Sequence, residues 1–210
     1  MNEAVQRKRG RRPKTEIYGS TRDLLLATAA RLFMQSGYPV VTIEDIARTA
    51  GVTKPAIFYH FSSKTDIFVE SIGGVLGYVL NRIEPILASP SSLPDRMLSV
   101  ALALLEIPAP LANFDVMLLG ASPSVPEDAL QALQGDLDEV FAKLERAIRA
   151  DAHPPLSRAD AAFLAHAFIS MLSLGQLEDS HGTRPFTDKM ALAHHVVDLI
   201  SVHWCMPVAR

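Results

Sequence analysis

The feature that most constrains the fold is a pair of short helix signals separated by one glycine. Thr42 is followed three residues later by Asp45, a capping pattern that begins a helix. Gly51 ends this helix after about two turns, because glycine adopts the left-handed conformation without strain. A second short helix is predicted over 54–59, where Pro55 is tolerated because the first helical turn needs no internal N–H donor. Such a pair is typical of a helix-turn-helix.

Start and stop signals predict helices along the rest of the chain. Ser20, Ser63 and Ser157 each precede an Asp by three residues, Thr53 is a further candidate cap, and Gly37 is a candidate left-handed stop. The expected helices cover 21–36, 42–50, 54–59, 63 to between 81 and 87, 95–106, 110–120, 126–150, 157–177 and 187–204. No segment shows convincing period-two alternation, so the fold class is all-α: an N-terminal three-helix domain with the helix-turn-helix, then a larger helical domain.

The two short helices leave one surface free. Apolar residues at Ile46, Val52 and Ile57 can pack the pair together, so the outer face of the second helix can enter a DNA major groove about 12 Å wide. The string from Thr42 to Lys64 resembles the N-terminal signature of the TetR family of transcriptional regulators. The matching residues are Thr42, Ile46, Ala47, Ala50, Gly51, Val52, Ile57, Phe58, Tyr59, His60, Phe61 and Lys64.

The resemblance implies contacts with double-stranded DNA. Base edges would be faced by Thr53, Lys54, Pro55 and Ala56, and the phosphate backbone would be contacted by Thr42, Tyr59, His60 and Lys64. Phe58 is also a candidate contact, but it stands where the family usually has tyrosine, which removes one phosphate hydrogen bond that Tyr59 could replace. His60 is equally well interpreted as an ordinary surface histidine, and Phe58 as a core residue.

The charge of the chain is unevenly distributed. The net charge is +6 up to Lys64 and −9 beyond it, although the whole chain carries only −3. A basic head on an acidic body indicates that the head meets a polyanion. Arg9, Arg11 and Arg12 lie in a basic arm, predicted to be flexible, that neutralises phosphates or enters a narrow A·T-rich minor groove.

The acidic body contains a segment, 159–177, that is apolar almost all round. A helix of this kind must be buried on more than one side, so a core on one side and a second subunit on the other are expected. The candidate dimer contacts are Phe168, Leu172, Leu192, Val196, Leu199 and Trp204. A two-fold dimer predicts a palindromic operator with half-sites about 34 Å apart or further.

The resemblance also implies a pocket for a small-molecule effector. The candidate lining residues are Phe114, Met117, Leu118, Phe141, Phe163, His166 and Met171. This lining favours a lipophilic or aromatic effector, and ordinary core packing is the alternative for each residue. Gly73, Gly74 and Gly77 lie in one predicted helix, where they soften a hinge or allow close approach of a neighbouring helix.

Other classes of protein find little support. The sequence has no catalytic motif and no strong metal-ligand pattern, so we expect no enzyme activity, cofactor or metal. The single cysteine and the lack of a signal peptide or a twenty-residue apolar span predict a cytoplasmic protein without membrane contact.

The expected division is an arm (1–19), a DNA-binding domain (20–66) and an effector-binding and dimerisation domain (67–210). The expected function is a repressor released from its operator by the effector; the alternative is a structural or partner-responsive DNA-binding protein without an effector.

Overall fold

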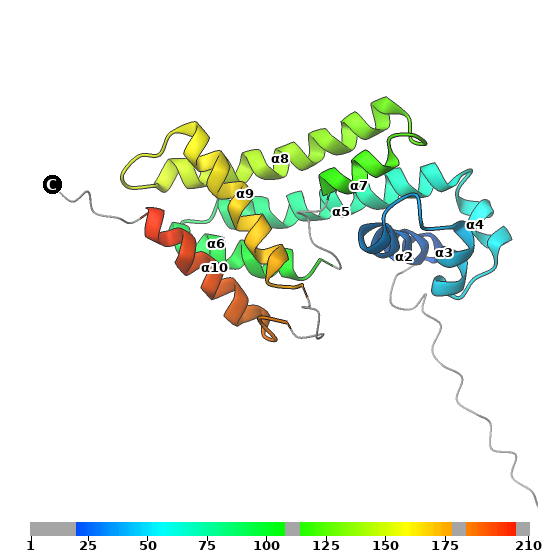
Figure 1. Ribbon diagram of the computed structural model, residues 1–210, viewed down its shortest axis with the longest axis horizontal. Helices are drawn as coiled ribbons and strands as arrows, with labels where there is room; N and C mark the ends of the chain where they lie inside the picture. Colours follow the sequence, from blue (N-terminus) through cyan, green and yellow to red (C-terminus); the bar gives the residue numbers. More distant parts are fainter. Residues whose placement is uncertain (1–19, 108–113, 178–183, 205–210) are drawn as a thin grey trace, which may run out of the picture.

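The computed structural model describes residues 20–107, 114–177 and 184–204, and within them it contains α-helices and turns but no strand (Figure 1). The helices are α2 (Thr21–Ser36), α3 (Ile43–Ala50), α4 (Lys54–His60), α5 (Lys64–Leu87), α6 (Leu93–Leu105), α7 (Phe114–Ala121), α8 (Glu127–Asp151), α9 (Arg158–Leu174) and α10 (Lys189–Trp204). The predicted all-α class is therefore confirmed.

Several helix starts depend on a short polar side chain. The hydroxyls of Ser20, Thr42, Ser63 and Ser157 each accept a hydrogen bond from the backbone N–H of the aspartate three residues on, as the sequence pattern predicts. Only the pair at Thr42 also makes the reciprocal bond of a full capping box, in which the Asp45 carboxylate accepts from the Thr42 backbone N–H.

Some details of the helix boundaries differ from the prediction. Gly37 has a positive φ of 79°, but its ψ of 158° places it outside the left-handed helical region. The α9 helix ends at Leu174 rather than at 177, and α10 begins at Lys189 rather than at 187. The start predicted at 110 for α7 falls on 108–113, outside the described residues.

The long α5 helix connects the two ends of the molecule (Figure 1). It packs against α2 at its first half, and against α6 and α8 further on. Phe68, Ile72, Leu76 and Ile83 are buried along its length, so its apolar face belongs to one continuous core. The predicted domain boundary at 66/67 falls within this helix, and the division itself remains a prediction.

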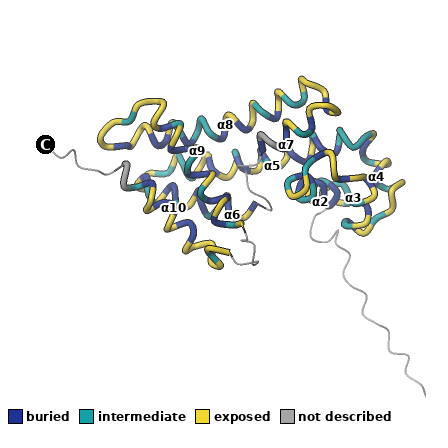
Figure 2. The backbone as a smooth tube through the Cα atoms, in the orientation of Figure 1, coloured by how far each residue is buried: buried dark blue, intermediate teal, exposed yellow. Residues whose placement is uncertain are grey.

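The body is a layered bundle around α5. The α8 helix lies between α5 and α9, while α10 packs against α6 and α9. Gly175, directly after α9, allows a close approach to α10, because a Cβ there would lie 2.3 Å from Leu192 Cδ1. Figure 2 shows exposed positions alternating with buried ones along α9 and α10. Among the described helices none is long and apolar enough to cross a membrane.

Candidate nucleic-acid interface

The turn between α3 and α4 is built as the sequence predicts. Gly51 has φ 78° and ψ 32°, the left-handed conformation, and its N–H donates to the carbonyl of Ala47. The N–H of Val52 donates to the same carbonyl at 3.0 Å, which closes the turn. Ile46 and Ile57 are fully buried where the two helices meet. The packing of the helix-turn-helix is thus fixed by apolar contacts, which leaves its outer side free.

The outer side carries the side chains expected to meet DNA. Thr42, Thr53, Lys54, Pro55, Phe58 and Tyr59 are exposed, whereas Ala56, His60 and Lys64 are half-buried. Tyr59 is 86% exposed, an unusual state for an aromatic side chain, and its ring contacts that of the neighbouring His60 edge-on. The structure therefore brings these residues to one end of the molecule; their contacts with DNA remain a prediction.

Thr53 was expected to cap α4, and this expectation is wrong. It occupies the N-cap position, but its side chain makes no cap hydrogen bond. A cap hydroxyl accepts from the second or third helical N–H. The second residue, Pro55, has no N–H, and the N–H of Ala56 donates to the Thr53 carbonyl at 3.0 Å. The Thr53 hydroxyl is consequently not used within the helix and remains on the exposed surface.

The arginine of α3 and the lysine of α4 are each paired with a carboxylate on the same surface. Arg48 pairs with Asp45, and Lys54 pairs with Glu44 on the other helix. The hydrogen bond from Lys54 lowers the pKa of the Glu44 carboxyl. Sequence reasoning missed Glu44, because its approach to Lys54 depends on the geometry of the turn between them.

Lys64, a predicted phosphate contact, lies over an aromatic ring at the start of α5. Its ammonium is 4.2 Å from the centroid of the Tyr38 ring, a cation–π geometry. Partial burial lowers the pKa of Lys64. The Tyr38 hydroxyl forms a hydrogen bond of 3.0 Å with Thr65, which holds the ring in place. A phosphate bound here would meet an ammonium that is already positioned.

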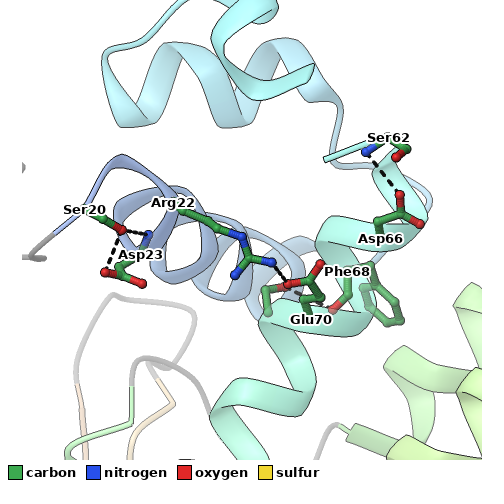
Figure 3. A network of polar contacts seen from close by, with 8 residues as sticks. Ser20, Arg22, Asp23, Ser62, Asp66, Phe68 and Glu70 are labelled. Atoms are coloured by element: carbon green, nitrogen blue, oxygen red, sulfur yellow. Dashed lines mark hydrogen bonds and ion pairs between the residues drawn. The ribbon is translucent and has the colours of Figure 1, made fainter. Parts of the chain in front are cut away.

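A polar network joins α2 to α5 behind the helix-turn-helix (Figure 3). Arg22 of α2 pairs with Glu70 of α5, and its guanidinium lies 5.0 Å from the centroid of the Phe61 ring at the end of α4. The Asp66 carboxylate accepts from the Ser62 N–H at 3.1 Å. These contacts orient α4 relative to α5, and the sequence offered no spacing signal for the pair between Arg22 and Glu70.

The predicted effector residues lie partly in the core and partly on the surface of the described body. Phe114, Met117 and Leu118 are buried in the core. The ring of Phe141 stacks on His166 at 3.9 Å between centroids. Of the remaining two, Phe163 is 71% exposed, and it lines, with Met171, a cavity of about 510 Å³ between α9 and α10.

A different cavity lies at the junction of head and body. It has a volume of about 350 Å³ and is walled by α2, by α5 and by the residues that end α6. Its lining is mainly apolar, with two carboxylates and one phenol among the polar groups. The lining residues are Leu26, Ala27, Ala30, Glu70, Ser71, Gly74, Val75, Tyr78, Glu106 and Ile107.

The predicted dimer contacts are mostly inside the protomer. Phe168, Leu172, Leu192 and Val196 are at most 3% exposed, so they offer almost no area to a partner, while Leu199 is 49% exposed. The exposed large apolar side chains of α9 and α10 include Phe163, Leu174, Met190 and Leu199. The side chain of Trp204 and the arm residues Arg9, Arg11 and Arg12 lie outside the described residues. In the described part of the chain no cluster of His, Cys, Asp or Glu could hold a metal ion.

This arrangement defines a class: a helix-turn-helix presented at one end of an all-helical body. Residues 25–70 match the family described as bacterial regulatory proteins, tetR family. The chain is 43% identical over 63 residues to the transcriptional repressor BepR of Brucella suis, which covers 30% of each protein. It is 46% identical over 50 residues to the transcriptional regulator AcrR of Shigella flexneri, which covers 24% of this chain and 23% of that protein. The matched segment therefore spans less than a third of these relatives.

Solved structures extend the similarity to the whole fold. A TetR-family regulator from Bordetella parapertussis superposes with a TM-score of 0.67 at 24% identity, over 92% of this chain and 100% of that one. The TetR-family regulator PfmR from Thermus thermophilus gives a TM-score of 0.55 at 25% identity, over 84% and 96%. Residues 25–70 are thus similar to the TetR family, as the N-terminal signature predicts, and the chain as a whole shares the fold of these solved regulators. The matched family is described as regulatory proteins, which agrees with the expectation that the chain has no enzymatic activity.

Proposed function

We propose that the protein is a sequence-specific DNA-binding transcriptional repressor that acts as a homodimer in the cytoplasm. The observation that carries this proposal is the surface of α4, where Thr53, Lys54 and Tyr59 are exposed while Ile57 anchors the helix in the core. A short helix held in this way can enter a major groove. Repression follows if the operator overlaps a promoter, because occupancy alone then blocks transcription.

Selection of genomic DNA fragments with the purified protein tests this function. We expect enrichment of a short palindrome, whose footprint weakens steeply as salt rises because bound phosphates release counterions. Tyr59→Ala should lose the footprint while its helical content stays unchanged. Diffuse binding without a preferred sequence would contradict the proposal.

A second copy of this chain is the proposed partner of the exposed apolar face of α9 and α10. Phe163 and Leu199 both line the cavity of about 510 Å³ on this face. Isolated proteins rarely expose contiguous apolar surface, so such a face marks an interaction site. A two-fold axis through these helices makes the interface self-complementary and places one helix-turn-helix on each half of a palindrome.

The cavity at the junction of head and body is the proposed effector site. Its walls come from α2 in the head and from α5 and α6 in the body, so an occupant would alter how these helices meet. The apolar lining suits a small lipophilic or aromatic molecule, and Tyr78 and Ser71 can orient its polar group. Gly74 leaves room on the α5 wall, since a Cβ there would meet no atom within 4 Å.

A substitution that fills this cavity distinguishes two functions. One is a repressor that an effector releases, and the other is a DNA-binding protein that responds to no small molecule. We expect Gly74→Leu to keep operator affinity but to lose release by lipophilic compounds that free the wild-type protein. The measurement is displacement of labelled operator DNA across a panel of such compounds. A wild-type protein that no compound displaces would favour the alternative.

A further inference from the structure

The helix-turn-helix itself carries no net charge. Between Ile43 and His60 the basic residues are Arg48 and Lys54, and the acidic residues are Glu44 and Asp45. Each basic side chain is engaged by one of these carboxylates. Attraction to phosphate must therefore come largely from elsewhere in the basic head, and the pairs on this surface serve another purpose.

Lys54 is held from two sides. Its ammonium pairs with Glu44, in the first turn of α3, and lies 5.9 Å from the centroid of the Phe58 ring, one turn further along α4. The side chains of Lys54 and Glu44 remain 49% and 58% exposed, so the pair sits on the surface expected to face DNA. A lysine side chain that would otherwise sample many rotamers is thus directed by a carboxylate and a ring.

The carboxylate changes what Lys54 can bind. A DNA phosphate that approached the ammonium would also approach Glu44, and the two negative charges repel each other. Base edges carry no such charge. An ammonium has three N–H donors, so Lys54 can donate one to Glu44 and keep two for the O6 and N7 acceptors of guanine in the major groove.

We propose that Glu44 is a specificity-determining positioning residue that directs Lys54 to a guanine base edge and away from the phosphate backbone. The proposal rests on the DNA-binding function proposed above, and it concerns which part of DNA Lys54 contacts. The hydrogen bond from Lys54 lowers the pKa of the Glu44 carboxyl, which favours the ionised form that the pair requires.

The test replaces the carboxylate by an amide of the same shape. Wild type and Glu44→Gln are each used to select from randomised DNA and are then titrated against the selected operator, with each guanine in turn replaced by 7-deazaguanine. We expect the wild type to lose about tenfold in affinity at one guanine per half-site, and Glu44→Gln to lose most of this discrimination. Non-specific binding by the variant should strengthen, with a salt slope steeper by about 1, because Lys54 then meets a phosphate.

Two controls separate positioning from other effects. Asp136→Asn removes the same charge from the exposed surface of α8 and should change neither the discrimination nor the salt slope. In a Lys54→Met background, Glu44→Gln should have no further effect on guanine discrimination, because its action passes through Lys54.

The outcomes distinguish this inference from the proposed function. A wild-type protein that enriches no sequence overturns the proposed function and this inference with it. An operator that both proteins select, with equal discrimination at every guanine and equal salt slopes, overturns the inference alone.

Discussion

The head and the body of this protein differ in how far their structure follows from local sequence. In the head, helix ends are fixed by caps at Ser20 and Thr42 and by the left-handed Gly51, and exposed charges form pairs. In the body, α9 is apolar on most sides, and local sequence does not state which side faces inward. A surface defined by local hydrogen bonds is thus easier to derive from sequence than an interior defined by the choice among apolar faces.

Removing a core phenylalanine from each region gives the largest expected effect. Phe33 in α2 packs against the rings of Tyr38 and Phe68, and Phe168 in α9 is fully buried. Phe33→Ala and Phe168→Ala should each lower the free energy of unfolding by about 3–5 kcal/mol. Because α5 contributes to the core of both regions, we expect one cooperative transition in urea, measured by circular dichroism at matched protein concentration.

The same experiment tests whether the head and the body unfold together. If Phe33→Ala melts part of the helical signal early while the rest melts at the wild-type midpoint, head and body are separate folding units. The predicted division at 66/67 would then be a thermodynamic boundary as well as a functional one.

The proposed dimer face gives the next largest effect. Phe163 is 71% exposed, so Phe163→Asp should leave the protomer folded but raise the dimer dissociation constant about 30-fold or more, as for a central aromatic anchor. Leu119→Asp is the matched control, because Leu119 is 74% exposed on α7, away from this face. Sedimentation equilibrium measures both. A dimer weakened only by Leu119→Asp would place the interface on the other surface.

The contrast between Phe163 and Phe168 shows that local sequence does not predict which side of α9 is buried. Both belong to one apolar helix, and the prediction assigned Phe168 to the partner and Phe163 to the ligand pocket. The structure buries Phe168 completely and exposes Phe163. Which phenylalanine faces the core depends on how α8 and α10 pack against α9. These are tertiary contacts between separate helices, so local sequence does not determine them. By contrast, Ile46, Ile57 and Gly51 followed directly from local pattern, and their positions are as predicted.

In the head, too, the interactions of some side chains cannot be predicted from local sequence. Thr53 has the right residue type for a cap, but Pro55 removes one donor and the backbone takes the other. Glu44 resembles any solvated acidic residue until the turn brings it to Lys54. Local rules therefore predict the elements of the site, and the tertiary structure decides what each side chain is free to do.

Gly73, Gly74 and Gly77 lie in α5, the helix that connects the head to the body. Their replacement by alanine is expected to stabilise the protein. A Cβ at Gly74 or Gly77 would meet no atom within 4 Å, and one at Gly73 would make an ordinary contact of 3.6 Å with Leu133. Close helix packing therefore does not require them, which favours a hinge over the alternative. Replacing all three with Ala should raise the free energy of unfolding by about 1–3 kcal/mol, because alanine is the better helix former.

The hinge hypothesis predicts a second effect of this triple variant. Operator affinity should change little, whereas release by an effector that frees the wild type should weaken, since a stiffer α5 resists the movement. Thermal unfolding and operator displacement are measured on the same preparation. A more stable variant with an unchanged response would show that the glycines are not a hinge.

The smallest expected effect concerns the cap of α3, which belongs to the head alone. The Thr42 hydroxyl accepts from the Asp45 N–H and donates to the Asp45 carboxylate at 2.6 Å, and this bond is the main cause of the lowered pKa of Asp45. Thr42→Ala should cost about 1 kcal/mol at neutral pH. The pKa of Asp45 is lower in the folded than in the unfolded protein. Its carboxylate therefore contributes fully to the free energy of unfolding above the unfolded pKa, and this contribution is lost as the pH falls through the folded pKa. The difference in free energy of unfolding between wild type and Thr42→Ala, measured in urea, should therefore shrink as the pH falls below about 4. In an Asp45→Asn background, the effect of Thr42→Ala on the free energy of unfolding should not depend on pH in this range. A pH dependence that persists in this background would assign the effect to another carboxyl group.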